Sequence, residues 1–411
     1  MKLKLMVELE IPDNEIDVNR IEEAVYEKRQ EIGRQLLIEA MEEIEEKAAD
    51  EMEGIRAGFV NCYWITRVGI VRIRKQRMRK DGKSFYPLDR VLGCERACTG
   101  ATEWVKRRGV ELSCDNPYRK AAEILGNEIG ASIGRTTLHR FVREAGQKYS
   151  EIEKKQWLEM REKEQDGPKE GKDLAVIEID ATYIHQQRRK WQRNKENLDV
   201  KLGIIYTGRE RFGKNKYRLK DKVVYGGIEG AEEFGEKLWL KGEEKLNIGE
   251  AKKQLVIGDG DSWIKGIKEM NFPEASYQVD WWHVTKNIRR AMGSNEALSK
   301  QLISKLYEGK GEKIVPLLSM KMSGLSEEQE EIGKLLEYLR HNEDGFYGNS
   351  GLSNEIKNKV GSGAIEKNIE LVIGRRFKKW GMSWSKDGAN YLLKLRILKH
   401  DREAWNDFWK N

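Results

Sequence analysis

The chain has 411 residues, of which 38% are hydrophobic and 35% are charged, so length and composition predict two to four domains with packed cores. It has no run of 18 apolar residues and no apolar signal-like segment after Met1, which excludes a membrane span and predicts a soluble, cytoplasmic protein. The formal net charge of +7 is uneven, because residues 1–56 hold 8 Lys/Arg against 17 Asp/Glu while the remainder is strongly basic. A basic body favours a polyanionic partner, although a solvated Lys/Glu-rich surface would have the same composition.

Residues 15–53 are the first predicted element, a long acidic helix that fills an N-terminal region over 1–56. The segment lacks proline, and its apolar residues recur at helical spacing: Ile21, Val25, Ile32, Leu36, Leu37, Ala40 and Ile44. This stripe predicts either packing on the helix's own domain or contact with a partner helix.

Residues 57–90 have the pattern of β-structure. Apolar and basic residues alternate over much of 57–80, and Asp81-Gly82 is a hairpin turn signal. A basic hairpin over about 67–83 would suit a phosphate backbone, although a solvated sheet face would look alike. We assign three of its side chains to DNA contact: Arg72, Arg74 and Lys75.

Residues 118–146 predict a helix-turn-helix, which completes a DNA-binding region over 57–160. Glycines at 126, 130 and 134 separate two helical segments, and the second has an apolar inner side. Its other face carries polar residues at positions i, i+3, i+4 and i+7: Thr136, His139, Arg140 and Arg143. A recognition helix presents such a face to base edges in the major groove, but helix pairs of this kind are also common elsewhere.

The polar segment 161–173 predicts a linker before a second domain over 174–411. Short apolar runs predict strands at 174–180, 200–207, 222–225, 254–258 and 276–279. Helices are expected over 232–246 and from Ser262. Three strands followed by helix, strand, helix and strand predict a mixed α/β sheet. Residues 284–345 predict a mostly helical region, and residues 363–379 predict a further helix.

Three carboxylates stand at informative places in this second domain. Asp180 and Asp259 end the first and fourth predicted strands, and Glu366 lies in the first turn of the late helix. Carboxylates brought together by a fold can hold two Mg²⁺ ions for phosphodiester chemistry. Each can also be a turn residue or a helix cap. Asp261 is an alternative to Asp259, and Glu178 is an alternative to Asp180 because residues i and i+2 share a strand face.

The second domain resembles prokaryotic insertion-sequence transposases of the DDE class, in the Mutator-like branch, and within it a family formerly catalogued only as uncharacterised proteins. The resemblance rests on IEIDATYIHQQR (177–188), VKLGIIYTG (200–208), VIGDGDSWIK (256–265), VDWWHVTKNIRRA (279–291) and the segment 361–390. A weaker N-terminal match includes YRKAAEILG and SIGRTTLHRFVREAG.

The resemblance implies a multidomain α+β protein: an N-terminal helical and helix-turn-helix region, then an RNase H-like catalytic domain with an all-helical insertion at about 284–345. It implies that Asp180, Asp259 and Glu366 are the catalytic acids and bind two Mg²⁺ ions, for which Mn²⁺ can substitute. Asp280 and His283 match a motif of Cys or Asp, two residues and His, and would support the acids or position DNA.

The implied function is that of a DNA transposase, which binds the terminal inverted repeats of an insertion sequence, cleaves its ends and joins them to target DNA. Its partners would be double-stranded DNA and further copies of the chain, in a nucleoid-associated homodimer or larger assembly. Basic clusters would add DNA contacts through Arg188, Arg189, Arg375 and Arg376, and Trp384 is a candidate for stacking on a base. The alternatives are a domesticated, non-catalytic DNA-binding protein and a structure-specific nuclease on the same fold.

Overall fold

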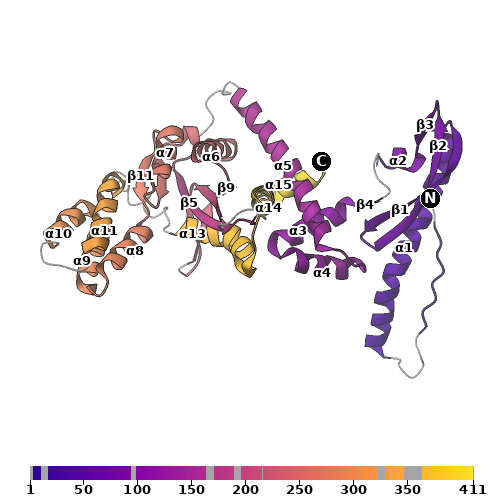
Figure 1. Cartoon of the computed structure of the whole chain (residues 1–411), viewed down its shortest axis with the longest axis horizontal. Helices are drawn as coiled ribbons and strands as arrows, with labels where there is room; N and C mark the ends of the chain where they lie inside the picture. Colours follow the sequence, from indigo (N-terminus) through magenta and orange to yellow (C-terminus); the bar gives the residue numbers. More distant parts are fainter. Residues whose placement is uncertain are drawn as a thin grey trace. The chain divides into compact units, whose positions relative to one another are not determined.

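The computed structural model describes residues 3–10, 17–93, 99–162, 171–188, 196–214, 216–308, 310–321, 329–346 and 363–410. The chain divides into two compact units: unit 1 comprises residues 1–145 with 403–411, and unit 2 comprises residues 146–402. The division falls inside helix α5 (Arg135–Glu162) (Figure 1). Both units combine helices and strands, so the protein is of the mixed α+β class. Among the described helices, none has both the length and the apolar character that a membrane crossing requires.

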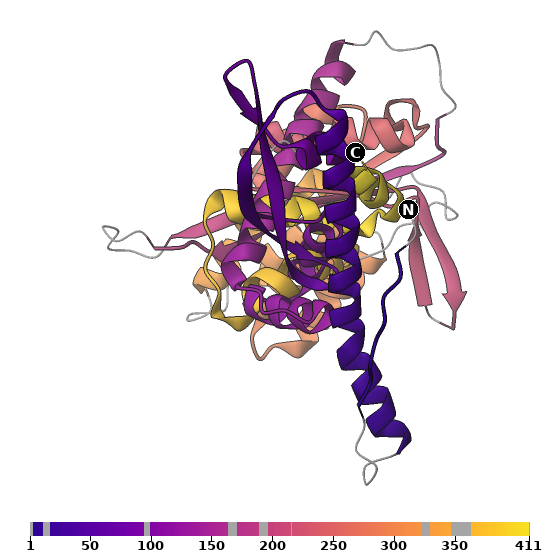
Figure 2. The same ribbon diagram turned by 90° about the vertical axis from the view of Figure 1, so that its right-hand side faces the viewer.

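Unit 1 contains the expected acidic helix as α1 (Val18–Glu51), which lies beside a four-stranded sheet of order β3-β2-β1-β4 (Figure 2). The strands are β1 (Ile55–Thr66), β2 (Gly69–Lys80), β3 (Lys83–Phe85) and β4 (Thr99–Ala101). The C-terminal half of α1 packs on β2 and on α2 (Pro87–Leu92). The N-terminal half leaves Val18 and Val25 exposed, so packing on its own unit covers only part of the helix.

The basic β-region consists of two successive hairpins rather than one. The expected turn at Asp81-Gly82 is present, with Lys80 opposite Lys83 and positive φ at both turn residues. A second turn, between Thr66 and Gly69, joins β1 to β2. Arg67 and Val68 occupy that turn. Neither is a residue type that is common in turns, so the sequence pattern did not reveal it.

Three further helices of unit 1 include the predicted helix pair. They are α3 (Glu103–Asp115), α4 (Tyr118–Ile129) and the first turns of α5. Gly130 ends α4 with φ of 66°, a left-handed conformation that glycine adopts without strain. A Cβ atom on Gly109 of α3 would lie 2.9 Å from Leu138 of α5, so glycine allows these helices to pack closely. Arg107 of α3 also donates to Asn406 of α15 (Arg402–Lys410) over 2.7 Å.

Unit 2 is built on a five-stranded sheet of order β11-β10-β5-β6-β9. The strands are β5 (Ala175–His185), β6 (Asn197–Tyr206), β9 (Val223–Gly227), β10 (Gln254–Gly258) and β11 (Ser276–Val279). Neighbours β5, β6 and β9 are antiparallel, whereas β10 is parallel to both β5 and β11. The mixed sheet predicted from the sequence is therefore present.

Two features of this sheet differ from the expectation. β5 continues to His185 instead of ending at Asp180, because β6 goes on pairing with it as far as Asn197. Between β6 and β9, the chain also forms a separate two-stranded sheet of β7 (Gly208–Gly213) and β8 (Lys216–Lys220), which the sequence pattern did not reveal.

Helices α6 (Ala231–Leu246) and α7 (Ser262–Asn271) lie where they were expected. The mostly helical region contains α8 (Trp281–Met292), α9 (Glu296–Tyr307), α10 (Ile314–Lys321) and α11 (Gln329–His341). Apolar side chains of these helices share one core with the sheet. The late helix is α13 (Ala364–Ile369), which continues as a π-helix through Glu370–Lys378, and α14 (Lys386–His400) follows.

Candidate active site

Three aspartates lie at one level across three neighbouring strands of the unit 2 sheet. β10 pairs in parallel with β5 on one side and with β11 on the other. Continuing the register of these pairs past the end of β10 places Asp259 beside Asp180 on one side and beside Asp280 on the other. Ligand sites commonly form at the carboxyl ends of parallel strands. The strand order thus brings together residues that are 79 and 21 positions apart in the sequence.

Asp180 and Asp259 are both partly buried, and each accepts a hydrogen bond from a nearby backbone N–H. Ala181 N donates to Asp180 Oδ1 over 2.7 Å, and Asp261 N donates to Asp259 Oδ1 over 2.9 Å. Burial, together with the negative charge of Asp259, raises the pKa of Asp180 to about 6. Burial also raises the pKa of Asp259. Both carboxyls therefore hold their protons more tightly than a free carboxyl does.

Three residues next to Asp259 have structural surroundings of their own. Asp261 is exposed at the N-cap of α7. A Cβ atom on Gly260 would lie 2.6 Å from the Asn342 amide nitrogen, and one on Gly258 would lie 2.7 Å from Ile264. Both glycines therefore allow neighbouring side chains to pack closely against the backbone beside Asp259.

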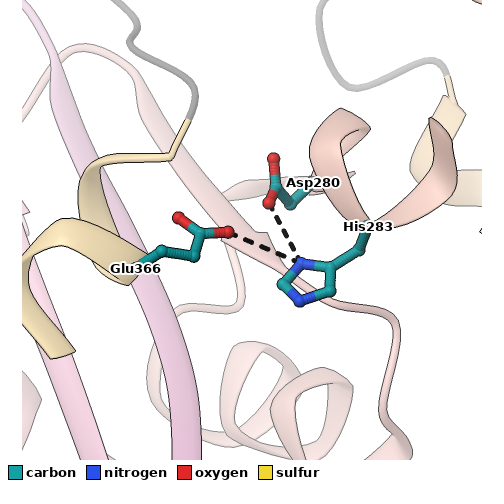
Figure 3. Close-up of side chains that lie close together, drawn as sticks. All are labelled: Asp280, His283 and Glu366. Atoms are coloured by element: carbon teal, nitrogen blue, oxygen red, sulfur yellow. Dashed lines mark hydrogen bonds and ion pairs between the residues drawn. The ribbon is translucent and has the colours of Figure 1, made fainter. Parts of the chain in front are cut away.

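His283 lies between two carboxylates, as Figure 3 shows. Asp280 caps α8 by accepting a hydrogen bond from Trp282 N over 3.2 Å, and His283 follows it in the same helix. His283 Nδ1 is 3.1 Å from Asp280 Oδ2 and 3.6 Å from Glu366 Oε1, and Glu366 lies in the first turn of α13. The three side chains thus point toward one another from two helices far apart in the sequence.

The pKa values in this cluster are shifted in different directions. Burial raises the pKa of Glu366, and the neighbouring Asp280 adds to that shift. Burial would also raise the pKa of Asp280, but its interactions with His283 and Glu366 outweigh it and the net direction is downward. Burial disfavours the charged form of His283, but Asp280 and the two other aspartates raise its pKa overall. The site therefore carries a surplus of carboxyl groups over cations, which favours a bound cation.

The residues of this site fit a divalent metal ion. One ligand atom each from Asp280, His283 and Glu366 lie within 4.8 Å of one another. Both Glu366 oxygens are shielded from solvent and have no hydrogen-bond partner among the described residues. Buried carboxylate oxygens without partners are costly, and a metal ion would satisfy them.

Glu178 has a different place from its neighbour Asp180. Its side chain is buried, accepts a hydrogen bond from Tyr206 Oη over 2.6 Å and accepts another from Ile365 N over 2.9 Å. Burial raises the pKa of Glu178 to about 7. Because Ile365 precedes Glu366 in α13, the Glu178 carboxyl fixes the start of that helix against β5.

A family model described as "Uncharacterised protein family (UPF0236)" matches residues 11–409. The chain belongs to this family. No curated protein matches the chain. A solved structure titled "Drosophila P element transposase strand transfer complex" is similar to it at 11% sequence identity and a TM-score of 0.35, covering 77% of this chain and 96% of that chain.

Most of the basic residues predicted to contact DNA are exposed in this UPF0236 member. On the hairpin, the Arg72 and Arg74 guanidinium carbons lie 6.0 Å and 4.2 Å from the ring centroids of Tyr63 and Phe59. On α5, an exposed face carries the four predicted residues: Thr136, His139, Arg140 and Arg143. Arg188 and Arg375 are exposed in unit 2, and Arg189 lies outside the described residues.

Two basic residues expected to contact DNA are buried instead. Lys75 is 2% exposed and pairs with Asp89 in the core of unit 1. It follows Ile73 by two positions, so it lies on the apolar face of β2. Arg376 is 1% exposed, and its guanidinium carbon lies 4.9 Å from the ring centroid of Trp384. Both side chains are packed inside their own units, so neither is placed to contact DNA.

Trp384 is buried as well, and its indole N–H donates to Phe377 O over 3.1 Å. It therefore packs in unit 2 rather than stacking on a base. Two tyrosines that the sequence did not single out also support the site. Tyr206 binds Glu178, and Tyr338 Oη donates to the backbone oxygen of Asp259 over 2.7 Å. No sequence signal marks either residue, because each contact joins elements distant along the chain.

Proposed function

We propose that the chain is a DNA transposase of the DDE class whose unit 2 carries out metal-dependent DNA end cleavage and strand transfer. The observation that carries the proposal is the convergence of acids: Asp180 and Asp259 at one level of adjacent strands, with Glu366 brought against Asp280 and His283. Five titratable groups from β5, β10, α8 and α13 meet there, and their pKa values influence one another.

The sheet supports an RNase H-like catalytic domain. Three antiparallel strands, β5, β6 and β9, are followed along the chain by β10 and β11, which run parallel to β5. This succession fits the fold that the sequence resemblance implies. The helices α8 to α11 lie between the second and third acids in the chain, as the resemblance also implies for the helical insertion.

The residues of the site supply distinct contributions to the proposed reaction. Asp180, Asp259 and Glu366 would hold two Mg²⁺ ions, which when bound activate the attacking oxygen and stabilise the leaving oxygen. Asp280 orients His283 through the hydrogen bond at Nδ1. The raised pKa values of Asp180 and Glu366 mean that protons must leave these side chains before they bind a cation.

DNA binding in this proposal falls to exposed basic surfaces. The α4–α5 pair would place the face with Arg140 and Arg143 in the major groove, and the β1–β2 hairpin would contact phosphates through Arg72 and Arg74. Both ends of an element must be held together for transposition, so the proposal includes a homodimer or larger assembly. The exposed apolar residues of α1, among them Val18 and Val25, are a candidate contact between copies.

The proposal is tested by a nicking and strand-transfer assay on labelled DNA that carries the ends flanking the chain's own gene, with Mg²⁺ or EDTA. We expect Mg²⁺-dependent cleavage and joining that Asp180→Ala, Asp259→Ala and Glu366→Ala each abolish while DNA binding is retained. Asp261→Ala is the matched control and should remain active. Binding of the ends without cleavage in any metal would favour a non-catalytic DNA-binding protein. Cleavage that ignores the ends and never joins strands would favour a nuclease.

A further inference from the structure

The β7–β8 hairpin of unit 2 stands apart from the catalytic sheet. Among the described strands, β7 and β8 pair only with each other, from Gly208 opposite Lys220 to Gly213 opposite Lys216, and they form a sheet of their own. An isolated two-stranded hairpin contributes little stability in water. The stability of unit 2 therefore does not explain which side chains this hairpin exposes.

The hairpin is strongly basic. Residues 208–220 hold six basic side chains and one acid, Glu210. Glu210 accepts a hydrogen bond from Arg218 over 2.7 Å. The remaining basic residues are Arg209, Arg211, Lys214, Lys216 and Lys220. The net positive charge per residue of this segment far exceeds that of the whole chain, whose net charge is +7 over 411 residues.

Two large aromatic side chains are exposed on the same hairpin. Phe212 is 61% exposed and Tyr217 is 48% exposed. The Arg209 guanidinium carbon lies 4.9 Å from the centroid of the Tyr217 ring. Aromatic rings among basic side chains are the combination that binds nucleic acid, because the cations meet phosphates and the rings meet bases or sugars.

We propose that the β7–β8 hairpin is a third DNA-contacting surface, in addition to the α4–α5 pair and the β1–β2 hairpin, and that it binds duplex DNA. The basic side chains contact phosphates, and Phe212 lies against a groove edge. A two-stranded β-ribbon is narrow enough for the major groove. The inference rests on the proposed function only in taking DNA as the ligand, and it does not require catalysis.

The register places this hairpin away from the acids. Leu202 of β6 is opposite Asp180, and the hairpin begins six residues later at Gly208. At about 3.3 Å per strand residue, the base of the hairpin lies up to roughly 20 Å from the level of Asp180. Its contacts with DNA are therefore remote from the reacting phosphodiester, and they contribute to affinity rather than to the chemical step.

The test measures how the affinity of the full chain for duplex DNA depends on salt. The triple variant Arg211→Gln/Lys214→Gln/Lys216→Gln removes three cations, and the matched control Lys155→Gln/Lys252→Gln/Lys300→Gln removes three exposed cations elsewhere in unit 2. Each phosphate contact contributes about 0.9 to the slope of log K against log salt, so the hairpin variant should flatten the slope by up to about 2.7. The control should not change it.

Phe212→Ala should weaken duplex binding about tenfold and Phe212→Tyr should restore most of it, as expected for an aromatic ring in contact with a groove edge. Single-turnover cleavage at saturating DNA should be unchanged in every hairpin variant, and thermal melts verify that each is folded. The inference would be overturned if the hairpin variants had the same salt slopes and affinities as the control variant, or if the chain bound only RNA duplexes. In either case, cleavage by the wild type would still support the proposed function. Hairpin-dependent DNA binding without cleavage would leave the inference standing and refute the proposed catalysis. A wild type that binds no DNA would refute both.

Discussion

The acidic site of unit 2 and the basic surfaces of unit 1 are held in place in different ways. Asp180 and Asp259 are partly buried, fixed by strand register and by backbone N–H donors. Arg74 and Arg143 project from the outer faces of a hairpin and a helix. A change in the buried site therefore alters folding as well as chemistry, whereas a change on an exposed face alters only what binds there.

The largest expected effect is a difference in stability between substitutions on the buried and exposed faces of β2. Lys75→Ala leaves the Asp89 carboxylate buried without its partner, and we expect the free energy of unfolding to fall by about 3–5 kcal/mol. Arg74→Ala, one residue away on the exposed face, should change it by less than about 0.5 kcal/mol. Denaturant unfolding measures both. A Lys75→Ala protein that is as stable as the wild type but binds DNA more weakly would reverse the assignment of the two faces.

The next effect is a dependence of stability on pH that follows from the burial of Asp180. The pKa of Asp180 is about 6 in the folded protein and about 3.9 in an unfolded chain, so the folded state holds this proton more tightly. Without metal, Asp180 adds roughly 2–3 kcal/mol to the free energy of unfolding below pH 4, where its carboxyl is protonated in the folded state. This contribution is lost as the pH rises to about 6. Thermal melts in EDTA should show this fall, and Asp180→Asn should remove it. Parallel pH profiles for the two proteins would contradict the account.

A smaller effect is expected for the carboxyl that fixes α13. Glu178→Ala leaves the Tyr206 hydroxyl and the Ile365 N–H without their acceptor, which should lower the free energy of unfolding by about 1–3 kcal/mol. Glu178→Gln keeps one acceptor oxygen and should cost less. The exposed Glu232→Ala is the control for loss of a carboxyl. If all three variants unfold at the same denaturant concentration, Glu178 does not fix the helix.

The smallest effect concerns the exposed face of α5. Arg140→Gln/Arg143→Gln should leave the free energy of unfolding unchanged and flatten the salt dependence of DNA binding by about 1.8, for two phosphate contacts. Lys154→Gln/Lys155→Gln, farther along the same helix, is the matched control. Equal slopes in the two double variants would show that this helix face does not contact DNA.

The sequence predicted the strands and helices around the acids well because their signals are local. Apolar runs such as 254–258 and 276–279 are short, bounded by turn residues and buried on both faces, and the structure has strands at the same positions. The extension of β5 to His185 could not be seen in the same way, because it depends on the partner strand β6 rather than on the residues of β5.

The side-chain environments were less predictable than the elements. Composition marks Lys75 and Arg376 as basic, but only the packing of α1 and α2 on β2, and of Trp384 on Arg376, determines that both are buried. The meeting of Glu366 with Asp280 and His283 depends on contacts across about 80 residues of chain. The place of Glu366 in the first turn of a predicted helix singled it out, but only the resemblance to DDE transposases drew attention to Asp280 and His283.

The most direct test of the account is whether Asp180, Asp259 and Glu366 bind divalent metal ions as one site. Manganese titrations of the full chain, followed by electron paramagnetic resonance and by calorimetry at pH 7.5, count the bound ions and give their affinities. We predict two bound ions for the wild type and for Asp261→Asn, and loss of at least one ion with Asp180→Asn, Asp259→Asn or Glu366→Gln. Binding that is absent in the wild type, or that Asp261→Asn removes while Asp259→Asn retains it, would contradict the account.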